Sequence, residues 1–289
     1  MTANTNSWVI HCHNGWGNGL VEVTEDHRKY LSVVFSWKLE EAVLRYGELL
    51  REGYDVEIGG PAADYAGISS MNGDTDFARY HNPSATRTST GCVFNCEFCI
   101  VPKVEGDLRE KTNWKVAPVV YDNCVNACSK RHFDTVIDSL KPVPGVDLNQ
   151  GISAALLTQH QANRLAELDL KRVRLAWDTV AYEPKFMRGY EMLRKAGIPK
   201  SKIGVYVLIG FRDTPEDALY RLETIRGLGV LPFPMRYQPL DTPKRNSYVG
   251  EHWTHSELVR YCRYWANIRF VGNMPFKDFV YPPSKLRLR

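Results

Sequence analysis

Three cysteines stand close together near residue 95, and their type and spacing suit metal chemistry. Cys92, Cys96 and Cys99 follow the pattern Cys-x3-Cys-x2-Cys within eight residues. Thiolates this close can bind one iron–sulfur cluster, because such a cluster needs several soft anionic ligands that converge from a loop. Three local ligands on a four-iron cluster leave one iron open to a small chelating molecule. The spacing therefore predicts redox chemistry at an open 4Fe-4S cluster.

These cysteines are also compatible with a zinc site or with burial as small core residues. A structural zinc site typically has paired Cys-x2-Cys motifs or histidine ligands at finger spacing, and no second pair follows here. A loop bounded by Gly91 and Asn95 is a poor place for three core residues. A zinc-stabilised protein that binds nucleic acid without catalysis is the alternative from a different functional class.

Strand-like and helix-like segments alternate on either side of this cluster of cysteines, up to residue 241. The predicted strands are Thr86–Thr90, Pro118–Tyr121, Val146–Asn149, Arg172–Trp177, Ile203–Ile209 and Val230–Tyr237. The predicted helices are Phe133–Leu140, Thr158–Leu168, Pro184–Ala196 and Pro215–Leu228. Thr214 and Pro215 have the residue types of a helix start. Repeated strand–helix units predict a parallel sheet with right-handed crossovers, and six units predict a partial barrel, because the closed form has eight.

The predicted fold class is α/β, a partial parallel (β/α)6 barrel with a small N-terminal α/β unit and a C-terminal helical cap. Residues 1–83 form the small unit and a connector, residues 84–241 the barrel, and residues 242–289 the cap and tail. The small unit is predicted to contain the strands Trp8–Cys12, Leu31–Phe35 and Tyr54–Ile58 and the helix Lys38–Glu52. In the cap, Trp253–Phe270 is predicted to be one aromatic helix.

The remaining cysteines are Cys12, Cys124, Cys128 and Cys262. Cys124 and Cys128 have the i, i+4 spacing of one helix face, and they follow the second predicted barrel strand. Cys128 is therefore a candidate catalytic residue, as a hydrogen-atom donor or a thiol nucleophile. The four thiols are also enough for an auxiliary cluster, although their separation in the sequence argues against one. Inert buried cysteines are the simpler interpretation.

Charge and hydropathy limit the partners and the location of the protein. Residues 1–80 contain 6 Lys and Arg against 12 Asp and Glu, whereas residues 81–289 contain 31 against 21. A solvated surface of mixed charges is the simpler interpretation, and the basic part is also compatible with an anionic, nucleotide-like substrate. The longest apolar run, Val205–Phe211, is far shorter than the roughly 18–20 residues of a membrane span. The first residues do not resemble a secretory signal, so that we expect a cytoplasmic protein with no membrane partner.

The segment Ser89–Pro102, at the end of the first barrel strand, resembles the radical S-adenosylmethionine (SAM) superfamily, and in detail its methylthiotransferase and cobalamin-dependent branch. The resemblance extends over about residues 84–241. It implies that the three cysteines hold a 4Fe-4S cluster whose fourth iron binds the amino and carboxylate groups of SAM. An electron from an external reductant, such as a flavodoxin or ferredoxin, then cleaves SAM to methionine and a 5′-deoxyadenosyl radical, which abstracts hydrogen from a substrate.

The same resemblance implies roles for residues that follow the first three strands. Phe98 would pack beside the adenine of SAM, and the backbone of Ile100 would bind the adenine edge. Asp122 and Asn123 stand where the superfamily has a Gly-Gly-Glu motif that holds the methionine amino group. At the end of the third strand, Asn149 and Gln150 would face SAM or the substrate.

Later strand ends supply the other candidate residues. Asp178 would bind the ribose hydroxyls or a polar substrate, and Gly210 would let the backbone approach the adenine closely. Arg236 and Gln238 alternate onto one side of the sixth strand, where they are candidate ligands for a substrate carboxylate, phosphate or base edge. All these positions lie at predicted carboxyl ends of strands, where barrel enzymes place their active sites.

The N-terminal unit resembles a shortened cobalamin-binding, Rossmann-like domain through the turn Gly59–Pro61. The Asp-x-His-x-x-Gly signature of cobalt ligation is absent. We therefore do not expect the chain to bind cobalamin. A cobalamin-dependent radical SAM methyltransferase is the alternative to the function expected below. The expected activity is reductive cleavage of SAM with hydrogen abstraction from an unidentified substrate, for which a nucleotide or nucleic-acid base is one candidate.

Overall fold

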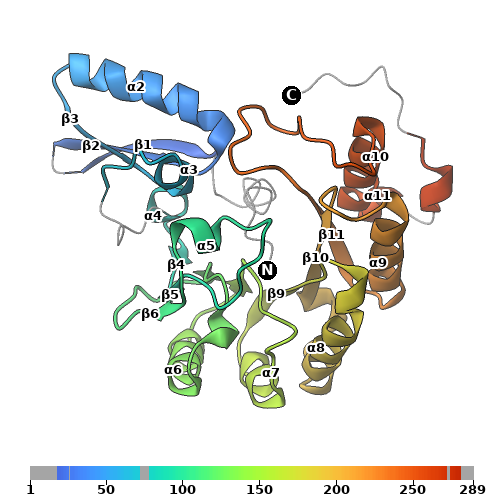
Figure 1. The fold of residues 1–289 in the computed structure, drawn as a ribbon. Helices are drawn as coiled ribbons and strands as arrows, with labels where there is room; N and C mark the ends of the chain where they lie inside the picture. Colours follow the sequence, from blue (N-terminus) through green and yellow to red (C-terminus); the bar gives the residue numbers. More distant parts are fainter. Residues whose placement is uncertain (1–17, 26, 72–77, 272–273, 281–289) are drawn as a thin grey trace.

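The computed structural model describes residues 18–25, 27–71, 78–271 and 274–280, and its centre is a six-stranded parallel sheet (Figure 1). In spatial order the strands are β11 (Leu231–Arg236), β10 (Ile203–Ile209), β9 (Leu170–Ala176), β8 (Val146–Leu148), β7 (Val119–Val120) and β4 (Ala85–Thr86). Every neighbouring pair is parallel, so that all carboxyl ends lie at one edge. The protein is therefore an α/β protein, as predicted.

One face of this sheet carries the crossover helices (Figure 1). They are α6 (Lys130–Leu140), α7 (Gln159–Ala166), α8 (Glu183–Lys195) and α9 (Pro215–Gly227). Because side chains alternate along a strand, Val205 and Val207 of β10 join the main core under the helices, whereas Tyr206 packs with Ala176 and Met235 on the opposite, inner face. The inner face also carries charged groups, among them the buried ion pair of Arg174 with Asp147.

Local sequence signals account for several of these elements. The predicted strand Ile203–Ile209 is confirmed as β10. The helix start at Thr214 is confirmed, since the Thr214 side chain and Asp217 form a reciprocal capping box at the start of α9. Thr158 and Thr254 cap α7 and α10 (His255–Ala266) in the same way.

Two predicted elements were wrong in extent. The predicted strand Thr86–Thr90 is divided into β4 and β5 (Ser89–Thr90), and β5 pairs in antiparallel fashion with β6 (Arg109–Glu110). The division arises because Thr88 donates hydrogen bonds from its backbone N–H and its hydroxyl to Asp122 instead of continuing the ladder. The predicted helix Trp253–Phe270 is α10 followed by α11 (Ile268–Val271), and the Asn267 side chain donates to the Arg263 carbonyl where α10 ends.

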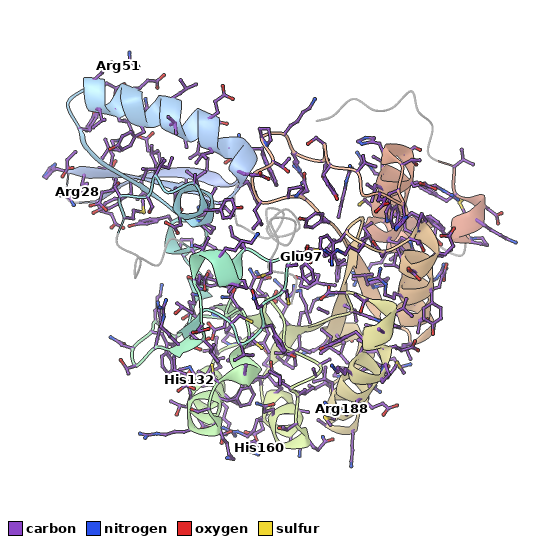
Figure 2. All side chains as sticks on the ribbon, viewed as in Figure 1. Arg28, Arg51, Glu97, His132, His160 and Arg188 are labelled. Atoms are coloured by element: carbon purple, nitrogen blue, oxygen red, sulfur yellow. The ribbon has the colours of Figure 1, made fainter. Side chains whose placement is uncertain are left out.

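The N-terminal unit is a separate three-stranded sheet with the order β1 (Leu20–Glu25), β2 (Arg28–Val33) and β3 (Asp55–Gly59), packed against α2 (Leu39–Arg51) (Figure 1). Helix α2 confirms the predicted helix, β1 was not predicted, and the predicted strand Trp8–Cys12 lies outside the described residues. Arg28 Nε and Nη1 lie 2.6 Å and 2.5 Å from carboxylate oxygens of Asp55 and Glu57 on β3 (Figure 2).

Short elements complete the chain. They are α3 (Pro61–Tyr65), α4 (Ala78–His81), α5 (Val101–Val104), η2 (Ser36–Lys38), η3 (Val125–Ala127), η4 (Val180–Tyr182), η5 (Lys200–Lys202) and η6 (Phe276–Asp278). The N-terminal unit joins the large sheet through a buried apolar cluster in which Val34 and Phe35 accompany Ala85 and Tyr121. No helix within the described ranges combines the length and the apolar character that crossing a bilayer requires.

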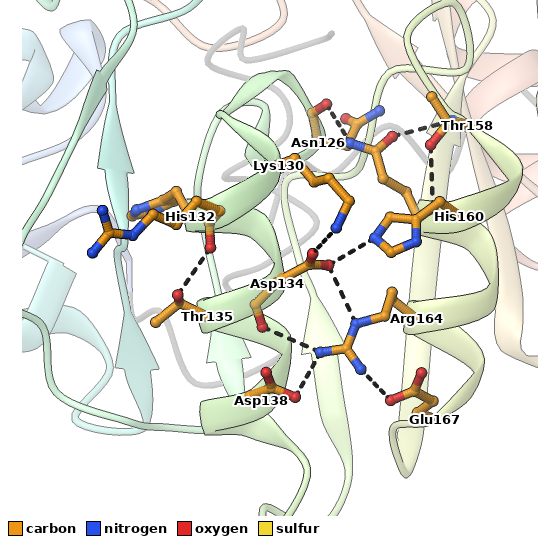
Figure 3. A network of polar contacts seen from close by, with 12 residues as sticks. Asn126, Lys130, His132, Asp134, Thr135, Asp138, Thr158, His160, Arg164 and Glu167 are labelled. Carbon is orange, nitrogen blue, oxygen red and sulfur yellow. Dashed lines mark hydrogen bonds and ion pairs between the residues drawn. The ribbon is translucent and has the colours of Figure 1, made fainter.

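Helices α6 and α7 are also joined by a network of polar contacts (Figure 3). The Asp134 carboxylate lies 2.5 Å from Lys130 Nζ, 2.8 Å from His160 Nε2 and 3.3 Å from Arg164 Nε. Arg164 also pairs with Asp138 and Glu167. Hydrogen bonds from Lys130 and His160 lower the pKa of Asp134 to about 2. The charged form of Asp134 is therefore favoured in the folded state.

We expect Asp134→Asn to destabilise the protein at neutral pH and to have little effect near pH 2. The pKa of Asp134 falls from 3.8 to about 2 on folding. Its stabilising contribution is therefore complete above the unfolded pKa and is lost as the pH falls through the folded pKa. Urea midpoints from pH 7 to pH 2 measure the difference from wild type, with Glu191→Gln on α8 as the control. A difference that stays constant over this range would contradict the assignment.

Candidate functional site

The three clustered cysteines lie on the loop between β5 and α5, at the carboxyl edge of the large sheet. Cys92 and Cys99 are buried and Cys96 is half-buried, and all three belong to one apolar cluster that also contains Phe94 and Phe98. Leu240, from the loop after β11, packs into this cluster. Residues from both ends of the large sheet therefore surround the cysteine loop.

The stem of the loop is held by the carboxylate of Glu105. Its Oε2 accepts hydrogen bonds from Gly91 N–H at 2.7 Å and from Asn123 Nδ2 at 2.7 Å, and it forms an ion pair with the buried Arg87. Asn123 Nδ2 also lies 3.1 Å from the Gly91 carbonyl. Gly91 has φ +70°, and a Cβ there would lie 1.9 Å from the Asp107 carbonyl oxygen, so that only glycine fits. One carboxylate thus fixes the start of the cysteine loop.

We expect Glu105→Gln to destabilise the fold by about 2 kcal/mol, because the buried Arg87 would lose its charged partner and a charge-assisted hydrogen bond. Iron retained after reconstitution should also fall, since the loop stem is released. Urea unfolding and iron analysis measure the two effects. The matched control is Glu97→Gln, which removes an exposed carboxylate 2.6 Å from Arg212 (Figure 2) and should cost under about 1 kcal/mol. Equal effects of the two variants would contradict this role.

The surroundings of the thiols suit metal ligation. Burial raises the pKa of Cys96, and it raises the pKa of Cys99 to about 12. The neighbouring buried thiol of Cys124 holds the pKa of Cys92 below its usual value. Thiolates at Cys96 and Cys99 thus need a nearby cationic centre to offset their desolvation, and a bound metal supplies one. In this respect the donor set fits an iron–sulfur cluster.

The three thiols suit an iron–sulfur cluster by their chemistry and surroundings, but they do not form a ready-made site for a single metal ion. In the part of the chain that the structure describes, no three His, Cys, Asp or Glu side chains converge as ligands of one metal ion.

A cavity of about 190 Å³ opens beside the cysteine loop. Phe94, Cys96 and Phe98 form one wall, and residues that follow β8 and β9, among them Asp178 and Tyr182, form the other. Burial raises the pKa of Asp178. The structure thus brings together three residues predicted from sequence, a cysteine, an aromatic residue and an acid, around a space for a small ligand.

Asn149 and Gln150 are buried directly after β8. The Asn149 carbonyl accepts a hydrogen bond from the Tyr206 hydroxyl at 3.0 Å. In contrast, Asn149 Nδ2 and Gln150 Oε1 have no hydrogen-bond partner within the described ranges. A buried polar atom without a partner costs about 1–3 kcal/mol, so that a polar ligand in contact with these atoms would be favoured. Both residues stay candidates for contact with SAM or substrate.

Other predicted site residues act on the protein itself. Asp122 accepts hydrogen bonds from Thr88, and Asn123 Nδ2 donates to Gly91 and Glu105, so that both side chains take part in holding the protein's own backbone and the cysteine loop. The carbonyl of Ile100 accepts hydrogen bonds from the N–H groups of Lys103 and Val104 within α5. These groups position the cysteine loop.

The residues predicted at the ends of β10 and β11 contact the loop and helix that follow. Arg236 Nη2 donates to the Tyr248 carbonyl at 2.6 Å, and Gln238 Oε1 accepts from Asn246 N–H at 2.6 Å. Because side chains alternate along β11, Arg236 lies on the same side of the strand as Pro232 and Pro234. Met235 lies on the other side, which belongs to the inner face of the sheet. Their predicted contact with substrate is therefore not supported by this geometry.

Two further predicted residues have their close contacts away from the cavity. Gly210 has φ +79°, and a Cβ there would lie 2.8 Å from Leu258 of α10, so that the close approach is to α10 and not to the cavity. Cys128 is buried, does not line the cavity, and follows the 3-10 turn η3 instead of sharing an α-helical face with Cys124. Burial raises the pKa of Cys128 to about 12. Neither position supports the predicted role.

Sequence reasoning missed several residues that shape this site. Glu105 and Arg87 flank the cysteine motif without any periodic signal, and Tyr182 ends the 3-10 helix η4 that follows β9. The aromatic character of Phe94, two residues after Cys92, was the available sign that the loop packs against an apolar cavity. No protein-family model matches the chain, and no curated protein matches it.

Proposed function

We propose that the chain is a radical SAM enzyme built on a partial parallel (β/α)6 barrel. It would bind a 4Fe-4S cluster at Cys92, Cys96 and Cys99 and bind SAM in the adjacent cavity. The observation that carries this proposal is the position of the cysteine loop, which is apolar and opens onto a cavity whose opposite wall carries Asp178. The reaction would begin with cleavage of SAM and continue with hydrogen abstraction from a second substrate.

The residues of the chain would have distinct tasks in this reaction. A bound cluster would supply the electron that cleaves SAM, and the protein would control access and orientation. Phe94 and Phe98, which line the side of the cavity next to Cys96, would exclude water there. Asp178 is placed to accept hydrogen bonds from hydroxyl groups, such as those of a ribose, on the opposite side. Glu105 and Asn123 keep the cysteine loop in place.

The partners would be SAM, a one-electron reductant and a second substrate. The excess of 31 Lys and Arg over 21 Asp and Glu in residues 81–289 favours an anionic, nucleotide-like second substrate. The N-terminal unit contributes Ser36, whose hydroxyl donates to the Thr242 carbonyl at 2.7 Å in the loop after β11. This contact joins the N-terminal unit to the loop after β11.

Anaerobic reconstitution with iron and sulfide tests the proposed function. We expect brown protein with about four irons per chain and a reduced-state electron paramagnetic resonance (EPR) signal that changes when SAM is added. With dithionite, this protein should produce 5′-deoxyadenosine and methionine. Colourless protein that carries zinc would instead support a metal-stabilised binding protein. A complete cluster that neither responds to SAM nor cleaves it would refute the proposal.

A further inference from the structure

Helix α2 of the N-terminal unit has apolar residues on its exposed face as well as on its buried face. Ala42 and Leu49 are fully buried against the three-stranded sheet. In contrast, Val43 is 47% exposed, Leu44 64% and Leu50 48%. Figure 1 shows α2 at the outside of the N-terminal unit, with the sheet on one side and no other described element on the opposite side. Single exposed apolar residues are ordinary on a protein surface, but three on one helix face indicate a contact surface.

The spacing of these residues produces one continuous stripe. Val43, Gly47 and Leu50 follow the i, i+4, i+7 spacing of a helix face, and Leu44 lies beside them. Gly47 is at the centre of the stripe, and a Cβ there would have no heavy atom within 4 Å. A glycine inside a helix is less stable than an alanine, and nothing in the described chain packs into the space that it leaves. This space would let the backbone of a second helix approach closely.

Two charged residues lie on the same face, one at each end of the stripe. Glu40 is in the first turn of α2, and Arg51 is its last residue. Arg51 Nε donates to the Gly47 carbonyl at 3.1 Å, but neither Arg51 nor Glu40 forms an ion pair with any residue that the structure describes. The neighbouring Glu41 and Arg45 of α2 do form ion pairs within the chain. The exposed face of α2 thus carries one acidic and one basic group that are left without a charged partner.

These two groups cannot satisfy each other within one chain. Glu40 and Arg51 are separated by 11 positions, about 16 Å along a helix that rises 1.5 Å per residue. In an antiparallel pair of α2 helices, with the two copies of Gly47 at the twofold axis, Glu40 of each copy lies near Arg51 of the other. Leu44 of each copy then meets Leu50 of the other. A twofold interface requires such a self-complementary surface, because every contact in it occurs twice.

We propose that two copies of this chain associate through antiparallel packing of α2 against α2. The partner is a second copy because the charges and the apolar residues of this face complement themselves. A single helix face is smaller than the roughly 800 Å² per partner of a standard interface, so that the dimer is weak and depends on concentration. The inference goes beyond the proposed function and does not depend on it, since α2 contributes no residue to the described cavity.

Sedimentation velocity of the full chain over a wide range of concentrations tests the dimer. We expect wild type to shift from monomer to dimer as the concentration rises. Leu44→Lys should weaken the association by at least about tenfold, because it places a charge from each copy in an apolar contact. The matched control is Val116→Lys, which changes a residue that is 46% exposed in the loop before β7 and should leave the association unchanged. Urea unfolding checks that both variants are folded.

Exchange of the two charges tests the antiparallel arrangement. Glu40→Arg alone would place two arginines opposite each other at both ends of the interface, and it should weaken the dimer by roughly fivefold. Arg51→Glu alone should have a similar effect, since it places two acids opposite each other. The double variant Glu40→Arg/Arg51→Glu restores opposite charges and should regain most of the wild-type affinity.

Zero-length cross-linking with a carbodiimide locates the contact. The amine introduced by Arg51→Lys should become linked to Glu40, and a mixture of isotopically labelled and unlabelled protein should show that the link joins two chains. Wild-type protein that stays monomeric at every concentration would overturn the proposal. A dimer that Leu44→Lys and the single charge variants leave intact would also overturn it, because that dimer would use another surface.

Discussion

Cys96→Ala protein should fold normally, lose its cluster and produce no more 5′-deoxyadenosine than a reaction without protein. Cys96 is the half-buried member of the cysteine motif and the one that lines the cavity. Its replacement removes few buried contacts, so that the free energy of unfolding should change by under about 1 kcal/mol. Loss of one of three local ligands leaves too few thiolates to hold the cluster against the solvent.

Three measurements separate loss of chemistry from loss of fold. Circular dichroism and urea unfolding report the fold, iron and sulfide analysis reports the cluster, and chromatography of the SAM products reports activity. The matched control is Cys262→Ala, which removes a half-buried thiol on α10, outside the cysteine loop. We expect this control to keep both iron and activity. SAM cleavage at the wild-type rate by Cys96→Ala protein would refute the assignment of the cluster.

Arg221→Met should destabilise the fold by about 3–5 kcal/mol, because it leaves a buried charge without its partner. Arg221 is fully buried and pairs with the carboxylate of Asp213. Its Nη1 donates to the carbonyls of Trp177 at 3.0 Å, Asp178 at 2.7 Å and Leu208 at 2.9 Å. One guanidinium thus joins the carboxyl ends of β9 and β10 beneath the cavity, so that the affinity for SAM should fall as well.

Urea unfolding of the apoprotein tests this prediction. Arg212→Met is the control, since Arg212 is exposed and pairs with the exposed Glu97, and its loss should cost under about 1 kcal/mol. The double variant Arg221→Met/Asp213→Asn removes the orphaned charge. Its new side-chain amide oxygen can still accept the hydrogen bond from Gly210 N–H that is 2.8 Å long in wild type. We therefore expect the double variant to recover part of the lost stability. If Arg221→Met unfolds at the same midpoint as Arg212→Met, the role is wrong.

Much of the architecture could be predicted because it depends on local pattern. The apolar run Ile203–Ile209 is long enough only for a buried strand, and Thr214 satisfies the N–H groups at the start of the next helix. Such signals require nothing beyond a few neighbouring residues. The strand Thr86–Thr90 was wrong because Asp122, more than thirty residues later, competes for the polar groups of Thr88.

The same distinction between local signals and long-range contacts applies to the candidate site residues. Phe98 and Asp178 meet at the cavity as the strand order predicts. Arg236 and Gly210 were assigned to the same edge, but their close contacts are with α10 and the loop after β11. A position at a strand end predicts the edge of the sheet, whereas the packing of later elements decides which neighbour the side chain contacts.

By itself, the amino-acid sequence determined the spacing of Cys92, Cys96 and Cys99, the strand and helix periods, and the end of the sheet at which chemistry is expected. Only the tertiary structure decided that Glu105 holds the cysteine loop and that Cys124 lies beside Cys92. The physical reason is the range of the interactions. Helix caps and side-chain alternation act over a few residues, whereas buried ion pairs and sulfur contacts form between segments that become neighbours only on folding.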